Sequence, residues 1–217
     1  LAAVNEVKGI ERIRFLTSHP NDMDDSIIDA VGGLDKVCEH INLPFQAGDD
    51  KILEQMRRGY TNSEYRNLIE KIRARIPGVS LSTDLIVGFC GESDKQFENT
   101  LKMIKDVKFD KIHSAAYSDR PGTIAHRKML DDVPEDVKKE RLKIINSEQE
   151  NIATELNDKF KGRCEEVLVE DTKKGRWFGR NRNDKLVFFD SEETFAGEVV
   201  KVNIEDTSPW FLEGSKT

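Results

Sequence analysis

Apolar residues along positions 1–120 alternate between the period of two that is typical of strands and the period of 3.6 that is typical of helices. Four segments predict strands: 12–17, 37–43, 79–89 and 111–117. Helices are predicted between them, at 23–31, 49–56 and 61–76, and again from Ser93 onward. Strand, loop and helix recur at least three times, each round taking the roughly 30 residues of a βαβ unit. The predicted fold class is α/β, with a parallel sheet or partial barrel.

Start and stop signals support these helices. Thr61 with Glu64, and Ser93 with Gln96, have the spacing of a capping box at a helix start. Pro134 is expected at the first position of a long polar helix reaching about residue 160, because its missing N–H costs nothing there. Such a helix is able to close a barrel or to bridge to a second domain.

The periodicity changes to two after Gly162. Five short strands are predicted, at 164–169, 177–180, 186–189, 197–204 and 210–212. So many strands in fewer than ~60 residues predict a small antiparallel β-barrel with an OB-like shape. We therefore expect two domains, an α/β domain at 1–160 and a β-barrel at 161–217.

Composition narrows the class of protein. The chain has 217 residues, 35% of them charged, with a net charge of −7, and no stretch approaches the ~20 apolar residues that span a bilayer. Its first residues lack the charged leader and long apolar run of a signal peptide. Cys38, Cys90 and Cys164 lie far apart, which excludes a disulfide framework and a local metal motif. We expect a cytoplasmic protein with no membrane partner and no metal site in this chain.

One basic stretch stands out against the net negative charge. It runs from Lys173 to Lys185, contains one acid, Asp184, and is interrupted by Trp177 and Phe178. Cations suit phosphates and rings suit bases, so the stretch predicts an RNA-binding surface, with a solvated hairpin as the alternative. Changing Arg180 and Arg182 together to Glu is expected to abolish binding. The candidate RNA-binding residues are Lys173, Lys174, Arg176, Trp177, Arg180, Arg182 and Lys185.

The strand ends form a second candidate site, because loops that follow parallel strands open on one mouth. Gln46 lies between Pro44 and Gly48 in a bent loop and is able to donate and accept hydrogen bonds, although a solvated turn explains it equally well. Asp84 is a carboxylate within an apolar strand. Burying it costs several kcal/mol unless it is paired, which favours a functional role.

Other residues of this mouth are open to two interpretations. His19, with Thr17 and Ser18, is interpreted as a loop or packing residue, with a role in the site as the alternative. Cys90 follows Gly88 in a turn and is interpreted as a small structural residue rather than a thiol ligand. Tyr117 and Arg120, in the exit loop of the last strand, complete the mouth.

Several stretches occur in an order that resembles a known family: Phe15-Leu-Thr-Ser-His-Pro20, Asn42-Leu-Pro-Phe-Gln-Ala-Gly48, Met56-Arg-Arg-Gly-Tyr-Thr61, Ser82-Thr-Asp-Leu-Ile-Val-Gly-Phe89, Gly91-Glu92 and Tyr117-Ser-Asp-Arg-Pro-Gly-Thr123. They are similar to motifs of the radical SAM methylthiotransferases. Positions 17–19 and 42–44 resemble the MiaB-type tRNA branch more than the ribosomal-protein branch. From about residue 161 the chain resembles the family's TRAM domain, a small RNA-binding β-barrel.

The resemblance implies a partial (β/α) TIM-like barrel of radical SAM type that binds S-adenosylmethionine, followed by TRAM. Family members also carry two [4Fe-4S] clusters, which the three cysteines of this chain cannot supply. Ala47 and Cys90 stand where relatives commonly have Ser and Pro. By the resemblance, Asp84 would lie in the mouth where substrate base and cofactor meet. The implied cofactor contacts are Gln46, Ser82, Ile86, Gly88 and Tyr117.

The implied function is the addition of a methylthio group to a modified adenosine beside the anticodon of tRNA, through reductive cleavage of S-adenosylmethionine and hydrogen abstraction. This chain is then the C-terminal portion of a transferase, inactive without its N-terminal half, with tRNA as its partner. Three alternatives stay open. They are a non-catalytic RNA-binding barrel–TRAM protein, a ribosomal-protein methylthiotransferase of the same family, and a non-radical α/β enzyme using Asp84 and His19 as acid and base.

Overall fold

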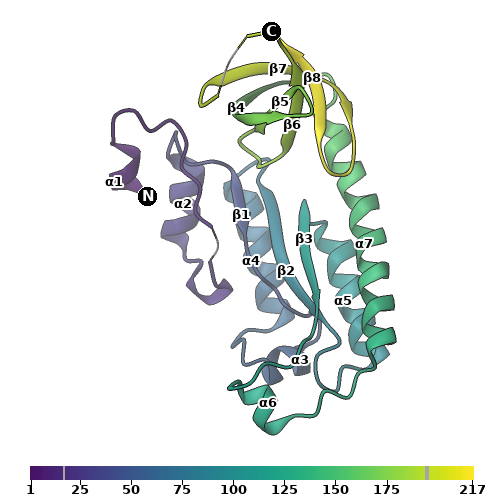
Figure 1. The fold of residues 1–217 in the computed structure, drawn as a ribbon. Helices are drawn as coiled ribbons and strands as arrows, with labels where there is room; N and C mark the ends of the chain where they lie inside the picture. The colour runs from purple at the N-terminus through teal and green to yellow at the C-terminus, as the bar shows by residue number, and fades with distance from the viewer. Residues whose placement is uncertain (17, 194–195) are drawn as a thin grey trace.

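The computed structural model describes residues 1–16, 18–193 and 196–217, which form an α/β unit and a β-barrel (Figure 1). The sheet of the α/β unit consists of β1 (His40–Asn42), β2 (Ser80–Val87) and β3 (Lys111–Ala116). The strands lie in the order β1-β2-β3 and both pairs are parallel, which confirms the predicted class. Single-residue bridges of Ile13 with Val37 and of Gln46 with Leu85 extend the sheet.

The strand predicted at 12–17 is wrong in extent. Within the described residues 12–16, Ile13 alone joins the sheet, through its bridge to Val37; Thr17 lies outside the described residues. A polar residue of this alternating segment contacts the β-barrel instead: Nη1 of Arg12 donates to the carbonyl of Arg180 at 2.6 Å. The neighbouring strand predicted at 37–43 is shorter than expected: β1 is limited to His40–Asn42, and Val37 forms an isolated bridge with Ile13.

Helices follow the strands largely as the pattern predicts. Both capping boxes are confirmed, at Thr61 with Glu64 and at Ser93 with Gln96. Pro134 is predicted to be the first residue of the long helix, but it is the N-cap residue and the helix begins at the next position. Its fixed φ therefore constrains the chain just before the helix. The helices are α1 (Ala2–Asn5), η1 (Pro20–Asp22), α2 (Asp25–Gly33), α3 (Asp50–Gln55), α4 (Asn62–Arg75), α5 (Asp94–Val107), α6 (Ile124–Lys128), α7 (Glu135–Asn157) and η2 (Asp158–Phe160).

The two faces of the sheet differ in chemistry. Figure 1 shows α4, α5 and α7 along one face, where Leu81, Leu85 and Val87 of β2 are buried. Phe45 and Phe109 stack there with ring centroids 5.5 Å apart. The alternate positions of the strands point to the opposite face and are polar or only half-buried, in the pattern of a barrel that is open on one side.

The C-terminal unit is a closed five-stranded barrel. Its strands are β4 (Cys164–Lys173), β5 (Arg176–Arg180), β6 (Leu186–Asp190), β7 (Val199–Thr207) and β8 (Leu212–Lys216). The ring order is β4-β5-β6-β8-β7, and β6 pairs with β8 in parallel, so the prediction of a purely antiparallel barrel is wrong in this pair. The chain crosses from β6 to β7 before it returns beside β6, and that crossover produces the OB-like topology.

Candidate functional site

A cleft of about 400 Å³ opens at the carboxyl ends of the three parallel strands. It brings together Gln46, Ile86 and Tyr117, three of the candidate cofactor contacts, and Arg120 lies beside them. Ligand sites of parallel sheets occur at this edge, because each strand delivers its loop there. Ser82 and Gly88 lie outside the lining of this cleft, and their binding role stays a prediction.

The backbone of Gln46 holds an unusual conformation at the cleft. Its φ is 66°, in the left-handed region that side chains other than glycine rarely adopt. Two bonds to β2 fix it there: its N–H donates to the carbonyl of Asp84, and its carbonyl accepts from the N–H of Ile86, both at 3.0 Å. A strained residue clamped on both sides is typical of a functional position.

Gly48, which brackets the same loop, has a structural role that the sequence analysis missed. A Cβ at this position would lie 2.3 Å from the Cα of Thr100 in α5. The Gly48 N–H donates to the hydroxyl of Thr100 at 2.9 Å. The close backbone approach that Gly48 permits in this structure is therefore to helix α5.

Asp84 belongs to a ladder of polar side chains on the open face of the sheet. The Ser82 hydroxyl donates to the Asn42 amide oxygen at 2.8 Å and lies 3.0 Å from Nε2 of His40. The Asn42 amide donates to Oδ2 of Asp84 at 3.4 Å. Burial lowers the pKa of His40, so the ring is neutral at pH 7. The carboxylate of Asp84 is thus half-buried and bonded, and it faces the open side.

Gly88 packs against a buried lysine. Its φ is +68°, and a Cβ there would meet the Cγ of Lys138 at 2.4 Å. Lys138 is 1% exposed, and its ammonium donates to Asp131 at 2.6 Å and to the carbonyl of Tyr117 at 3.3 Å. Burial alone would lower the pKa of Lys138, but the bonds to Asp131 and Glu135 outweigh burial and raise it.

A second buried ion pair stabilises the same turn, and the sequence analysis missed it. Glu92 accepts from the N–H of Gly88 at 2.6 Å and from Nη1 of Arg141 at 2.8 Å. Burial raises the pKa of Glu92 in spite of these partners. In the sequence, the pair is visible only as one acidic and one basic residue in two elements expected to pack together. Such combinations are too common to identify a pair 49 residues apart.

Tyr117 links the cleft to this turn. Its ring lies edge-on to Phe89 at 5.0 Å, and its backbone N–H donates to the carbonyl of Val87 at 2.8 Å. Burial and the thiol of Cys90 raise the pKa of Tyr117 to about 12, so the phenol keeps its proton at pH 7. Cys90 is buried beside this tyrosine, which agrees with its interpretation as a structural residue.

His19 caps a short helix. Its Nδ1 accepts from the N–H of Asn21 at 3.2 Å, and its ring lies edge-on to Tyr60 at 5.7 Å. Burial lowers the pKa of His19. Among the described residues no hydrogen bond or ion pair joins it to Asp84, so the structure does not support the acid–base pair of the non-radical alternative.

The basic stretch divides into three parts in the structure. Lys173 and Lys174 are exposed in the β4–β5 turn, where Lys174 and Gly175 both have positive φ. Arg176 is bonded to Glu213 at 2.6 Å and Trp177 packs against the barrel core. Arg180, Arg182 and Lys185 lie toward the α/β unit. Whether each binds RNA stays a prediction. Within this stretch, Lys173 and Lys174 are the exposed lysines for which the described residues provide no ion pair.

Arg182 fastens the barrel to the α/β unit. Its Nε and Nη2 bind both carboxylate oxygens of Glu39 at 2.7 Å, and Nη1 donates to the carbonyl of Asp35 at 3.0 Å. Lys185, 8% exposed, pairs with Asp110 at 2.7 Å. A double reversal of Arg180 and Arg182 would therefore break the domain contact, and loss of RNA binding in that variant would not identify the RNA surface.

Neither a metal-binding cluster nor a membrane-spanning helix is found in the described part of the chain. There, no three histidine, cysteine or acidic residues lie close enough to hold a metal ion. Cys38 and Cys90 are buried and Cys164 is exposed at the start of β4. No described helix is both long and apolar enough to cross a membrane.

Comparison with known proteins defines the class first. Residues 1–104 match the family model of the radical SAM superfamily, and residues 158–217 match that of the TRAM domain. Among solved structures, coproporphyrinogen III oxidase (HemN) from Escherichia coli, a radical SAM enzyme, aligns with 60% of this chain and 31% of its own, at a TM-score of 0.49 and 19% identity. The two family models match the α/β unit and the β-barrel in turn, in the order radical SAM and then TRAM.

Curated relatives then define the family. A "tRNA-2-methylthio-N(6)-dimethylallyladenosine synthase" of Dehalococcoides mccartyi (strain CBDB1) is 49% identical over 98% of this chain and 51% of its own length. Proteins of the same name from Herpetosiphon aurantiacus and Acetivibrio thermocellus are 48% and 47% identical over 99% and 98% of this chain, and 50% and 45% of their own. The chain belongs to the radical SAM methylthiotransferases. It spans about half the length of the curated relatives it matches.

Proposed function

We propose that this chain is the cofactor-binding and RNA-binding portion of a cytoplasmic tRNA methylthiotransferase, with residues 1–160 as half-barrel and 161–217 as TRAM domain. The observation that carries the proposal is the 49% identity to a tRNA methylthio synthase across 98% of the chain, because it runs through both units. The substrate is then an N6-dimethylallyl adenosine of tRNA beside the anticodon, and the product is its 2-methylthio derivative.

The cleft at the strand ends fits the adenosyl part of S-adenosylmethionine. Ile86 and Phe89 offer an apolar wall for a purine ring, while the Gln46 amide is able to donate and accept. S-adenosylmethionine bound there supplies the methyl group and the radical chemistry. The residues of this chain bind and orient it, and the side chain of Tyr117 lies beside it.

The iron–sulfur clusters of the family do not fit the cysteines of this chain. Cys38 and Cys90 are buried at separate places and Cys164 is on the barrel, so the three thiols do not converge. We derive no step through a cluster from these residues. The cluster ligands are proposed to come from an N-terminal half that joins this chain, and the chain by itself is proposed to be inactive.

The open face of the sheet supports such a partner half. Its side chains are polar and bonded to one another from His40 to Asp84, and in the described part of the chain α4, α5 and α7 lie along the opposite face. Polar residues toward the sheet interior are typical of a barrel that encloses a site. In the whole enzyme this face would become the barrel interior, with Asp84 below the cofactor cleft.

Binding of S-adenosylmethionine tests the assignment of the cleft. Equilibrium dialysis with the radiolabelled cofactor should detect weak, saturable binding that S-adenosylhomocysteine competes away. Replacing Gln46 with Ala should weaken it about tenfold, the worth of one hydrogen bond. The matched control is Asn67→Ala, an exposed amide on α4. Equal affinities for the Gln46 variant and the unchanged chain would contradict the assignment.

A further inference from the structure

Aromatic side chains cover the outside of the barrel on one face, where a solvated β-barrel normally places polar residues. Interior positions of β5 and β6 alternate with exterior ones, and the exterior ones include Phe178 and Phe188, directly paired across the two strands. Their ring centroids are 5.8 Å apart, and Phe211 continues the row 5.4 Å from Phe188. All three rings are half-buried and lie outside the barrel core.

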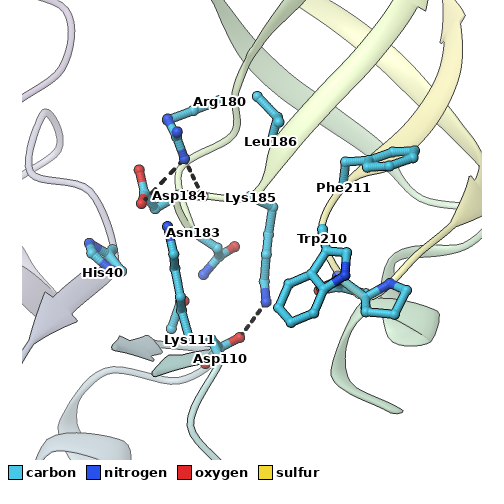
Figure 2. A pocket seen from close by; sticks show the side chains of 13 residues that line it. His40, Asp110, Lys111, Arg180, Asn183, Asp184, Lys185, Leu186, Trp210 and Phe211 are labelled. Atoms are coloured by element: carbon cyan, nitrogen blue, oxygen red, sulfur yellow. Dashed lines mark hydrogen bonds and ion pairs between the residues drawn. The ribbon is translucent and has the colours of Figure 1, made fainter. Parts of the chain in front are cut away.

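This aromatic row leads into a pocket between the barrel and the α/β unit. The pocket has a volume of about 220 Å³ and is lined by Arg180, Leu186, Trp210 and Phe211 of the barrel, and by His40 and Lys111 of the sheet. Figure 2 shows His40 and Trp210 on opposite sides of it, with Lys185 bonded to Asp110 between them. The volume is below the roughly 300–1,000 Å³ of pockets for whole drug-sized ligands, so it suits one ring system.

Trp210 is the most unusual residue of this pocket. It is 55% exposed and is held by a turn in which the Ser208 hydroxyl accepts from its backbone N–H at 3.2 Å. No other ring stacks on it and no hydrogen bond is formed by its indole in the described part of the chain. Lys111, also exposed, forms no ion pair among the described residues. A free indole and a free ammonium at one pocket are what a nucleotide needs.

We infer that a single-stranded stretch of RNA crosses the β5–β6 face and places one unpaired base on Trp210 in the interdomain pocket. OB-like barrels bind oligonucleotides on the face of their second and third strands, between two loops. Here these strands are β5 and β6, and the loops are the Lys173–Lys174 turn and the segment that carries Trp210. The inference rests on the proposed RNA-binding function and names the residues and the form of RNA.

Stacking and charge contribute separately to this site. Arg176 and Arg180 each pair with carboxylates of the barrel, so their charge is largely neutralised. Among the described residues, Lys173 and Lys174 of the β4–β5 turn and Lys111 at the pocket form no ion pair. The rings therefore supply affinity that hardly depends on salt, whereas the lysines supply the salt-dependent part.

Fluorescence anisotropy with the 217-residue chain and a labelled ten-nucleotide single-stranded RNA tests the inference. Trp210→Ala should weaken binding about tenfold at every salt concentration, and Trp210→Phe should restore most of the affinity. A Lys173→Ala, Lys174→Ala variant should instead lower the slope of log Kd against log salt by about 1.4, at roughly 0.7 per phosphate contact. Leu130→Ala, an exposed apolar residue of the α/β unit, is the control.

The outcomes separate the inference from the proposed function. Failure of the unchanged chain to bind the RNA at low salt would overturn RNA binding by this chain, and the inference with it. Binding that Trp210→Ala leaves unchanged would overturn the inference alone. A duplex of the same sequence that loses as much affinity in Trp210→Ala as the single strand would also contradict it, because a paired base cannot leave its stack to enter the pocket without cost.

Discussion

Gln46 shows how one residue joins the fold to the site. Its left-handed backbone, with φ of 66°, is held by bonds to Asp84 and Ile86 on β2, and its side chain is delivered to the cleft. A side chain costs roughly 1–2 kcal/mol in this conformation, and glycine avoids that cost. Glutamine at this position therefore adopts a backbone conformation that favours glycine.

The strain at Gln46 leads to a prediction about stability. Gln46→Gly should be more stable than Gln46→Ala by about 1 kcal/mol in urea unfolding, because only glycine adopts the left-handed region freely. Both variants should lose the cofactor affinity that depends on the amide. An alanine variant as stable as the glycine variant would show that φ at this position is not fixed.

The elements were predictable where their signals are local. The two capping boxes and the strand–loop–helix steps from β1 to α3 and from β2 to α5 could be derived from residues a few positions apart, as could the five strands of the barrel. The contact of Arg182 with Glu39, which joins the barrel to the α/β unit, could not be derived in this way because the two residues are 143 positions apart. Alternation around Ile13 predicted a strand, but Arg12 and Arg14 alternate with it because they reach the barrel. The parallel pairing of β6 with β8 also depends on the path of the chain rather than on any local pattern.

The loop between β5 and β6 is predicted to fix the barrel on the sheet. Arg182→Ala removes a bidentate ion pair and bonds to two carbonyls, and should lower the free energy of unfolding by about 1–2 kcal/mol. In this variant, the rate of backbone amide hydrogen exchange should rise at residues 35–39 and 181–185. The control is Arg66→Ala, whose pair with Asp106 at 3.0 Å lies within the α/β unit. Unchanged exchange at both segments would contradict the role of this contact.

Lowering the pH should weaken the same contact between Arg182 and Glu39. Burial opposes ionisation of Glu39, but the bonds from Arg182 outweigh it and lower the pKa of Glu39. A carboxyl whose folded pKa is lowered contributes stability that is present above its unfolded pKa of about 4.3 and is lost as pH falls through the folded value. Stability measured across this window should fall less in Glu39→Gln than in the unchanged chain. Identical slopes would contradict the contribution of Glu39.

At the scale of the whole molecule, the two candidate sites lie at opposite ends of the sheet. The cleft is at the carboxyl ends of the strands, and the barrel sits at the amino ends (Figure 1). The 8 residues of β2 separate them by about 26 Å, at ~3.3 Å per residue. In the proposed function, RNA held by the barrel would therefore have to span the length of the sheet to bring a base to the cleft. The bonds of Arg182 to Glu39 join the barrel to the sheet, and in the proposed function they would help to set that distance.

The central claim is that this chain supplies the cofactor- and RNA-binding half of a tRNA methylthiotransferase, and nucleoside mass spectrometry tests it most directly. The chain would be joined to the N-terminal half of the Dehalococcoides mccartyi relative, to which it is 49% identical. The resulting chimeric protein would be incubated with tRNA, S-adenosylmethionine and a reductant, and the intact relative would serve as the control. We predict 2-methylthio-N6-dimethylallyladenosine in the tRNA, greatly reduced by Gln46→Ala. A folded chimera that binds tRNA and S-adenosylmethionine but forms no methylthio nucleoside, while the intact relative does, would contradict the claim.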